Sequence, residues 1–438
     1  MKIKPKNVRK VLDEKILADG FEPIIDLNKS YGSYLVDQRN GDEYLDMFSM
    51  YASGAVGYNH PYILKHKDIL GDIAINKTTL SDIYNVYYAD FMETFSKYAM
   101  PKHFKKVFFI DGGSLAVENA LKAAFDWKKR KNLDNGFKQE GDKVIYFNQS
   151  FHGRSGYTLT LTNTSDPRKT MYFPKFPWFK VDNPKLSFPV SDTVLNDIVI
   201  KENKIIKEIN NIISKNVNDV AAIIIEPIQG EGGDNHFRNE FMVKIREICD
   251  DNDIILIFDE VQTGIGITGK MWAHEYFSVK PDIISFGKKT QVCGMMASER
   301  ICDYDNNVFK ESSRINSTFG GNLVDMYRFK LILEIMCNEN LFSNAQEMGS
   351  HLLEHITELT NQFPGYVTNP RGQGLFCAFD LPSTIERDKM ISELLKEKVI
   401  ILGSGDNSIR FRPHLNVKKK DIDLAFEKIN MVCKTMLN

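Results

Sequence analysis

The sequence predicts an α/β fold with a mostly parallel central sheet. Residues 221–225 form an apolar run that stops at a glycine- and acid-rich loop, 226–233. A helical pattern from Asn239 to Asp251 then leads to a second apolar run, 254–258, which ends at Asp259. Strands that are apolar on both faces and alternate with helices are typical of buried parallel sheets.

The N-terminal residues predict a small sheet. Residues 33–47 alternate apolar and polar positions on both sides of Asn40-Gly41, a dipeptide typical of β-hairpins. Residues 47–61 are rich in glycine, alanine and serine and contain two tyrosines. We therefore expect them to form a loop packed close to a ligand or partner.

A strand and the turn that follows it, at residues 107–114, predict an anion site. Val107–Ile110 reads as a buried strand, and the turn after it leads into a helix, Leu115–Lys131, with Ser114 as its cap. Backbone amides in such a turn point outward with the positive end of the helix dipole, which suits a phosphate. The alternative is that this turn only begins a helix.

A second strand, Val144–Phe147, precedes the loop 150–154. In that loop the ring of Phe151 could stack on a flat cofactor, while the guanidinium of Arg154 binds a carboxylate through two hydrogen bonds. A surface arginine beside a core phenylalanine is the alternative interpretation.

Asp259 and Lys288 are the strongest candidates for chemistry. Lys288 follows a further apolar run, 283–286, just as Asp259 ends its own run. Parallel strands bring their carboxyl ends to one edge of a sheet, so the two residues can flank one ring. Pyridoxal phosphate needs an amine that forms a Schiff base and an anion beside its pyridine nitrogen. Taken singly, each residue is more often a surface charge or a helix cap.

The last ninety residues change to an α+β pattern, and we predict three regions. Residues 1–60 pack with the C-terminal domain, residues 61–325 form the large cofactor-binding domain, and residues 326–438 form the small domain. Further helices are expected at 197–216, 323–339, 343–363, 385–397 and 420–436, and further strands at 374–380, 399–402 and 408–411.

Composition excludes several classes of partner. The 438 residues are 42 % hydrophobic with a net charge of −2 and no long basic block, so neither nucleic acid nor a membrane is expected as a partner. The first seventeen residues lack the apolar stretch of a secretion signal, which predicts a cytoplasmic protein. The six cysteines form no CxxC pair and no cluster with histidine, so we predict neither disulfides nor a metal site.

Residues 264–269 satisfy the pattern G-x-G-x-x-G, which in other proteins binds a dinucleotide. The pattern lies well beyond the end of its strand and does not clearly open a helix. A nicotinamide oxidoreductase is therefore a weak alternative.

Taken together, the motifs and their order resemble the class III, or ω-, aminotransferases, which use pyridoxal phosphate on the fold type I scaffold. The resemblance covers nearly the whole chain. Within the class, the string FGKKTQVCG is similar to that of the L-lysine 6-aminotransferases, because the wider class has a glycine-rich continuation after the lysine. The motifs that carry the resemblance are GGS, FHGR, EPIQGEGG, FDEVQTG, GKK, STFGG and IRFRP.

The resemblance implies a role for each matching residue. Lys288, rather than Lys289, would form the Schiff base and move the proton between substrate and cofactor. Asp259 would keep the pyridine nitrogen protonated, and Gln262 would bind near the ring oxygen. The remaining cofactor contacts implied are Gly113 and Ser114 to the phosphate, Phe151 to the ring, and Thr318 to the phosphate of a second subunit in a homodimer.

Two arginines and one acid are implied to select the substrates. Arg154 would bind the α-carboxylate of L-lysine, or the γ-carboxylate of 2-oxoglutarate. Arg410 would bind the α-carboxylate of 2-oxoglutarate, and Glu231 would pair with Arg410 when lysine is bound. The products would be 2-aminoadipate 6-semialdehyde, which cyclises, and L-glutamate.

Other ω-aminotransferases, acting on ornithine, 4-aminobutyrate or a diamine, are the nearest alternatives to a lysine-specific enzyme. An aminomutase or a decarboxylase would use the same Lys288 and Asp259. Neither would need 2-oxoglutarate, and so neither would need both Arg154 and Arg410.

Overall fold

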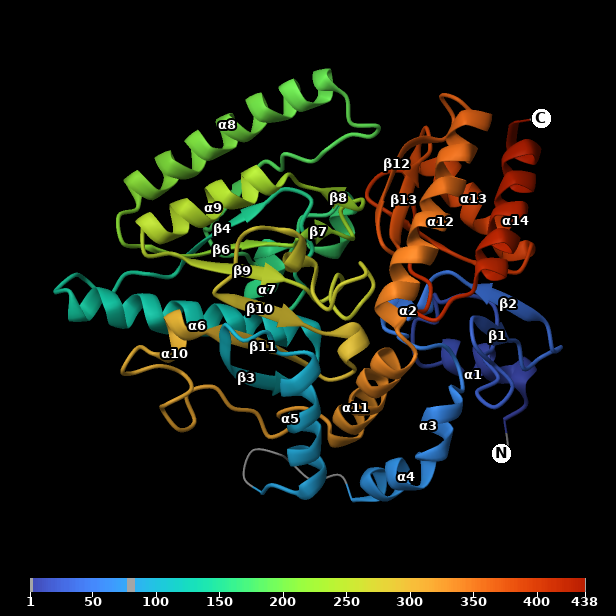
Figure 1. Cartoon of the computed structure of the whole chain (residues 1–438), viewed down its shortest axis with the longest axis horizontal. Helices are drawn as coiled ribbons and strands as arrows, with labels where there is room; N and C mark the ends of the chain where they lie inside the picture. The colour runs from blue at the N-terminus through green and yellow to red at the C-terminus, as the bar shows by residue number, and fades with distance from the viewer. Residues whose placement is uncertain (1–2, 77–82, 438) are drawn as a thin grey trace.

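The computed structural model describes residues 3–76 and 83–437 and confirms the α/β fold class (Figure 1). Its centre is a seven-stranded sheet in the order β3-β11-β10-β9-β6-β4-β5. Neighbouring strands are parallel except at β11, which runs antiparallel to both β10 and β3. The strands span Phe104–Ile110 (β3), Lys143–Phe147 (β4), Phe179–Val181 (β5), Val220–Ile225 (β6), Ile255–Asp259 (β9), Ile283–Phe286 (β10) and Cys293–Ser298 (β11).

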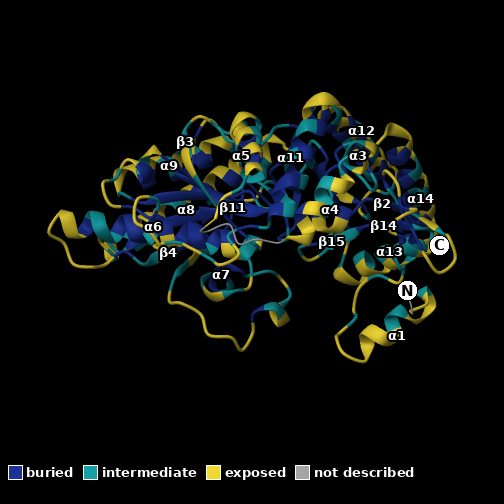
Figure 2. Ribbon diagram, turned by 90° about the horizontal axis from the view of Figure 1, so that it is seen from below, coloured by how far each residue is buried: buried dark blue, intermediate teal, exposed yellow. Residues whose placement is uncertain are grey.

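The apolar strands are buried on both faces. In β6, Ala222 and Ile224 pack with helix α6, whereas Ile223 and Ile225 pack in a separate cluster with helix α9. Successive strand residues point to opposite faces, so one apolar run fills two cores. Each fully buried isoleucine contributes about 2 kcal/mol relative to an exposed one. Figure 2 shows these buried segments inside the molecule, with exposed residues concentrated on outer helices and loops.

Helices cover both faces of this sheet (Figure 1). Helix α6 contacts β11, β10, β9 and β6, while α9 contacts β9 and is itself covered by α8. The helices from the N-terminus through this part are α1 (Val8–Asp13), α2 (Ser49–Ala52), α3 (Pro61–Lys65), α4 (Lys67–Ile75), α5 (Val86–Tyr98), α6 (Gly113–Asp134), α7 (Gly156–Leu161), α8 (Asp192–Lys215), α9 (Asn239–Asp251), α10 (Glu299–Cys302) and α11 (Leu323–Asn338). Short 3₁₀ helices span Pro5–Asn7 (η1), Pro167–Lys169 (η2), Ala273–Tyr276 (η3) and Lys288–Thr290 (η4).

The predicted hairpin around Asn40-Gly41 is confirmed. Strands β1 (Tyr34–Val36) and β2 (Glu43–Asp46) pair antiparallel, with Val36 opposite Glu43. Strand β14 (Val399–Ile400) then adds to β2 in parallel, so the blue N-terminal and red C-terminal segments lie side by side in Figure 1. The proposed domain boundaries at residues 60 and 325 remain a prediction.

The C-terminal part contains an antiparallel sheet in the order β12-β13-β16-β15, packed against α12. The elements are α12 (Leu341–Gln362), β12 (Thr368–Gln373), β13 (Phe376–Asp380), α13 (Thr384–Lys396), β15 (Leu402–Ser404), β16 (Ser408–Phe411) and α14 (Lys419–Leu437), with a separate pair, β7 (Ile228–Gln229) and β8 (Asn235–His236), near α9 in sequence.

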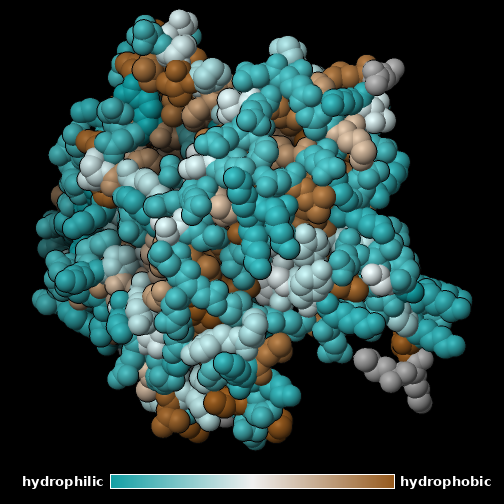
Figure 3. Space-filling model, turned by 45° about the vertical axis from the view of Figure 1, so that its right-hand side comes forward, coloured by the Kyte–Doolittle hydropathy of each residue, from teal (hydrophilic) through white to brown (hydrophobic). Residues whose placement is uncertain are grey.

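On the face shown in Figure 3, hydrophilic residues predominate and apolar ones are scattered. Within residues 3–76 and 83–437, none of the helices combines the length and apolarity of a membrane span.

Two local expectations are wrong. The segment 47–61 is not a loop throughout, because Ser49–Ala52 form a single left-handed turn with φ from +43° to +67°. Ser114 does not cap α6, because the helix begins one residue earlier and Gly112, at φ +102°, occupies the cap position. That φ favours glycine, which has no Cβ to clash with the backbone.

Candidate active site

A cavity of about 500 Å³ opens at the carboxyl ends of the parallel strands. Its walls come from the loops after β3, β4, β6, β9 and β10 and from β16, so residues distant in sequence meet there. This edge of an open α/β sheet is where ligands generally bind. Nine of the predicted residues line it: Gly113, Ser114, Phe151, Arg154, Glu231, Asp259, Gln262, Lys288 and Arg410. A larger hollow, about 720 Å³, lies over α6 and contains none of them.

Lys288 extends its amine into this cavity from a strained turn. Its Nζ donates a hydrogen bond of 3.0 Å to the carbonyl oxygen of Tyr51, which belongs to the left-handed turn α2. Lys288 itself has φ +56°, and such conformations cost about 1–3 kcal/mol per residue. Burial, followed by the positive charge of Arg410, lowers the pKa of Lys288 to about 8. A neutral, nucleophilic amine is therefore accessible near physiological pH.

The neighbouring Lys289 points elsewhere. It does not line the cavity, its side chain is almost fully buried, and its Nζ has no hydrogen-bond partner among the described residues. Burial lowers its pKa well below the usual range. Of the two lysines, only Lys288 lies where a ligand in the cavity can be reached.

Asp259 is held by a histidine that the sequence analysis overlooked. The Oδ2 atom of Asp259 lies 2.7 Å from Nδ1 of His152, and its Oδ1 accepts a 3.0 Å bond from the amide of Val261. Both side chains are buried, at 4 % and 2 % exposure. These contacts fix the orientation of the carboxylate within the cavity. His152 stands between Phe151 and Arg154 in the FHGR motif, and that position was the only sequence signal.

Glu226 is a second residue that the sequence analysis missed. Its two carboxyl oxygens accept hydrogen bonds of 3.0 Å from the amides of Phe151 and Gly230, so it joins the loop after β4 to the loop after β6. Complete burial raises the pKa of Glu226 to about 7. The backbone of Phe151, and with it the placement of its ring, therefore depends on the Glu226 carboxyl group.

An ion-pair group forms another wall. Arg410, which is 3 % exposed, lies 3.0 Å from Glu231, and Lys169 lies 2.6 Å from the same carboxylate. Burial alone would raise the pKa of Glu231, but Arg410 and Lys169 outweigh it and hold that pKa below its usual value. Lys169, on the short helix η2, had no signal in the sequence.

A second arginine of the IRFRP string, Arg412, also lines the cavity. Its guanidinium contacts the carboxylate of Asp234 at 2.6 and 2.9 Å and donates to Oε1 of Gln262 at 3.0 and 3.1 Å. The amide oxygen of Gln262 is thereby occupied, which leaves its NH₂ group as the free donor.

Arg154 and Thr318 differ in their placement. Arg154 lines the cavity and is exposed, and it makes no hydrogen bond or ion pair within residues 3–76 and 83–437. An unpaired guanidinium in a cavity is a ready partner for a ligand carboxylate. Thr318 is also exposed but does not line the cavity of its own chain.

The start of α6 has the free backbone amides that the predicted anion-binding turn requires. The first amides of a helix have no intrahelical acceptor, so those of Gly113 and Ser114 are available to a ligand. The hydroxyl of Ser114 is already in contact with Ser155 and Thr158, at 2.5 and 2.7 Å. A Cβ on Gly153 would lie 2.3 Å from the Ser114 hydroxyl, so only glycine allows the two loops to meet.

These groups fit pyridoxal phosphate. The cavity offers a primary amine, a histidine-supported carboxylate, a phenylalanine ring and free helix-start amides, which suit the aldehyde, the pyridine nitrogen, the ring face and the phosphate. The G-x-G-x-x-G string, by contrast, is a buried turn packed against the C-terminal helices, where a Cβ on Gly266 would meet Met336 at 2.8 Å. The φ of Gly266, +80°, favours glycine and explains the residue without a dinucleotide.

Comparison with known proteins agrees with this geometry. The profile of the aminotransferase class-III family matches residues 17–433. The L-lysine-epsilon aminotransferase of Mycobacterium tuberculosis is 45 % identical over 97 % of this chain and 95 % of its own length, and that of Streptomyces clavuligerus is 41 % identical over 97 % and 93 %. A solved lysine aminotransferase from M. tuberculosis superposes with a TM-score of 0.96, covering 99 % of this chain and all of the other at 45 % identity. The chain therefore belongs to the class-III aminotransferase family, in agreement with its motifs and its cavity.

Proposed function

We propose that the protein transfers the ε-amino group of L-lysine to 2-oxoglutarate, releasing 2-aminoadipate 6-semialdehyde, which cyclises, and L-glutamate. The main supporting observation is that the cavity holds two arginines in opposite states. Arg154 is free for a carboxylate, whereas Arg410 is neutralised by Glu231. Lysine carries one carboxylate and an apolar chain, and 2-oxoglutarate carries two carboxylates. The names of the relatives that are 41–45 % identical support the same substrate.

Class-III aminotransferases use pyridoxal phosphate, which this chain binds as its cofactor. When bound, it supplies an aldehyde that takes up the amino group and a ring that spreads the charge left on the deprotonated carbon. Lys288 would hold the cofactor through its aldehyde and would act as the base and acid at the substrate carbon. Asp259, supported by His152, would hold the proton of the pyridine nitrogen. Phe151 would pack on the ring.

Regiospecificity follows from where the carboxylate binds. Arg154 holds the α-carboxylate of lysine, so that the ε-amine, at the other end of the chain, reaches Lys288. Glu231 neutralises Arg410 while the apolar chain of lysine lies beside it. When 2-oxoglutarate binds, Glu231 turns away and Arg410 takes the α-carboxylate; Lys169 offers the displaced carboxylate a second cation, 2.6 Å away in this structure.

The proposal includes a homodimer with shared sites, located in the cytoplasm. Thr318 is exposed and lies outside its own cavity, which is compatible with a contact to the phosphate bound in a second subunit. A monomer would then lack part of its phosphate site.

A single-turnover spectrum tests the function. The holoenzyme mixed with L-lysine alone should lose the visible absorbance of the cofactor attached to Lys288 and regain it when 2-oxoglutarate is added. The cyclised semialdehyde should be trapped by an aminobenzaldehyde reagent. If L-lysine leaves the band unchanged while ornithine or 4-aminobutyrate bleaches it, the substrate assignment is wrong and a sister specificity replaces it.

Glu231→Gln should separate the two half reactions. Removing its charge leaves Arg410 unpaired beside the lysine chain, at a cost on the order of 3 kcal/mol, so the lysine half reaction should slow about 100-fold. The glutamate half reaction, in which a substrate carboxylate pairs with Arg410, should slow less than about tenfold. Stopped-flow spectra of each half reaction measure both effects.

The surface variant Glu240→Gln controls for the loss of one negative charge, because Glu240 is exposed and pairs with Arg238 outside the cavity. Equal slowing of both half reactions in Glu231→Gln would count against the switching role.

Attachment of the cofactor to the apoenzyme should depend on pH through Lys288. Its pKa is lowered to about 8, so the reactive neutral amine is scarce below pH 7 and predominates above pH 9. The attachment rate should therefore rise with pH, with a midpoint near 8. Arg410→Gln should move the midpoint upward, because it removes a positive charge that lowers the pKa and leaves Glu231, which raises it.

Visible absorbance after rapid mixing at a series of pH values measures the rates. Ionisations of the cofactor itself are common to both proteins and cancel in the comparison. Identical midpoints in the two proteins would contradict the assignment to Lys288.

A further inference from the structure

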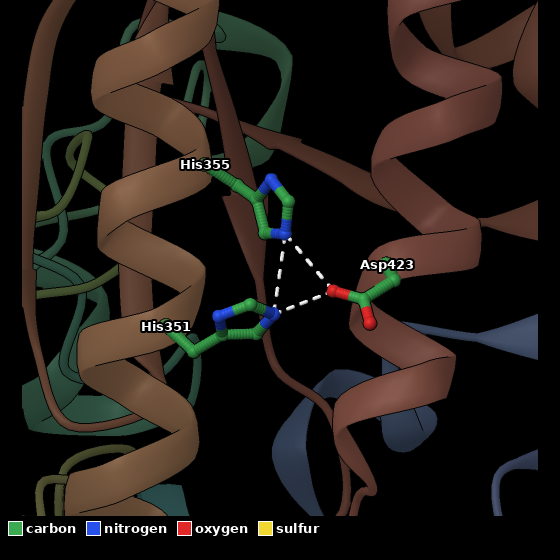
Figure 4. A group of neighbouring side chains, drawn as sticks. All are labelled: His351, His355 and Asp423. Atoms are coloured by element: carbon green, nitrogen blue, oxygen red, sulfur yellow. Dashed lines mark hydrogen bonds and ion pairs between the residues drawn. The ribbon is translucent and has the colours of Figure 1, made fainter.

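Outside the active site, three side chains with metal-binding atoms converge between helices α12 and α14. His351 and His355 come from α12 and Asp423 from α14, and all three point toward one another (Figure 4). The two Nε2 atoms lie 3.2 Å apart, and Oδ1 of Asp423 lies 2.5 Å from His351 and 3.0 Å from His355. None of the three lines the active-site cavity.

Hydrogen bonds alone fit poorly to the arrangement of the two Nε2 atoms and Oδ1 of Asp423. Each imidazole nitrogen presents either a proton or a lone pair. If both present protons, the two N–H groups lie only 3.2 Å from each other. If only one does, a lone pair of the other faces the carboxylate oxygen, at 2.5 Å for His351 or 3.0 Å for His355. A cation between the three atoms would be bound by a lone pair from each.

The spacing also suits a metal. Bonds of about 2.0–2.1 Å in tetrahedral geometry place neighbouring ligand atoms about 3.3 Å apart. The two contacts made by His355, at 3.2 and 3.0 Å, are close to that value, and the third is shorter. Histidines four residues apart share one face of a helix, so little rearrangement is needed to bring them together on an ion.

The surroundings hold His355 in place. Its ring stacks on Phe426 at 4.9 Å and 13°, and Phe426 stacks on Phe411 at 5.4 Å and 16°. On the other side, Oε2 of Glu358 lies 3.5 Å from Nδ1 of His355. Metal-bound histidines commonly have a carboxylate at the nitrogen that does not bind the metal. With exposed fractions of 18 %, 26 % and 46 %, the three side chains remain open to an ion and its water ligands.

We propose that His351, His355 and Asp423 form a binding site for one divalent transition-metal ion, with Zn²⁺ as the expected ligand. Two imidazoles and one carboxylate suit zinc and its neighbours, whereas Mg²⁺ prefers an all-oxygen site. The ion joins α12 to α14 and so stabilises the C-terminal part. Cysteine spacing could not predict it, because the site uses an H-x-x-x-H pair and an aspartate 68 residues further along the chain.

Metal titration of the holoenzyme tests the site. Chelator-treated protein is titrated with Zn²⁺, bound metal is counted after dialysis, and thermal unfolding is followed with and without Zn²⁺ or Mg²⁺. We expect one Zn²⁺ per chain at this site and a Tm raised by several degrees, with no shift in Mg²⁺. His355→Gln and Asp423→Asn should each weaken Zn²⁺ binding at least about tenfold and abolish the Tm shift.

His66→Gln is the control, because His66 is also a partly exposed histidine, between α3 and α4, and among the described residues it belongs to no group of three metal-binding side chains. Any ion held elsewhere, for example by the exposed Cys337, would persist in all variants. Both site variants should keep the cofactor absorbance and aminotransferase rate of the parent, which reports that they fold. Unchanged Zn²⁺ stoichiometry and affinity in Asp423→Asn would overturn the proposal. So would the absence of Zn²⁺ binding by the parent protein at about 100 µM Zn²⁺, a concentration at which even a weak site is occupied.

Discussion

Lys288→Ala is expected to lower kcat with L-lysine and 2-oxoglutarate by about 10²- to 10⁴-fold, the range that a general acid–base group contributes. The substitution removes the amine that carries the proton at the substrate carbon. The substitution should also abolish the visible absorbance of the cofactor attached to Lys288. Contacts to the cofactor's phosphate can still retain the cofactor as its free aldehyde. Steady-state kinetics and an absorption spectrum of the dialysed variant measure both effects.

Lys289→Met is the matched control for this variant. The methionine side chain has a similar volume and no charge, and Nζ of Lys289 has no hydrogen bond to lose within residues 3–76 and 83–437. We expect kcat within about threefold of the parent, because a volume-conserving change in a packed site is tolerated. The opposite pattern, with activity lost in Lys289→Met and kept in Lys288→Ala, would reassign the reactive lysine.

Asp259→Asn should lower kcat by about 10²- to 10³-fold, the usual effect of removing one group that stabilises developing charge. The amide keeps the shape of the side chain but not its charge, and it leaves His152 without its anionic partner. The pyridine nitrogen then loses the anion that holds its proton, and the substrate carbon loses its proton more slowly. Single-turnover rates with L-lysine measure the effect directly.

The neighbouring Glu260 offers a control of equal burial. It accepts bonds from the amides of Ala273 and His274, and from the hydroxyl of Thr263, all outside the cavity. Glu260→Gln should lower Tm while the single-turnover rate stays close to that of the parent. If Asp259→Asn with full cofactor content kept more than a tenth of the parent rate, its assigned role would be wrong.

The strands were predictable where local sequence and burial agree. The runs that became β6, β9 and β10 are apolar throughout because both faces of a central parallel strand are covered, and the amphipathic pattern of α9 placed both its ends correctly. Strand β11 (Cys293–Ser298) had no such signal. Its glycine, methionines and alanine have little strand preference, and its pairing with β3, far away in sequence, decides its conformation.

Active-site residues were likewise predictable only where the local sequence carried a signal. Lys288 and Asp259 follow apolar runs, so the sequence itself indicates that they meet at one sheet edge. His152, Glu226 and Lys169 are single polar residues whose importance depends on what the fold buries beside them. No periodicity reports such tertiary contacts, which is why these three residues emerged only from the structure.

The pairing of β14 with β2 has a consequence for synthesis on the ribosome. Strand β2 ends at residue 46, but its parallel neighbour begins at residue 399. At about 5–20 residues per second, roughly 20–70 s pass between the two. Throughout that time one edge of β2 has no partner strand and is open to pairing with other chains. Chaperone binding to nascent chains should therefore concentrate on this hairpin until the C-terminal strand emerges.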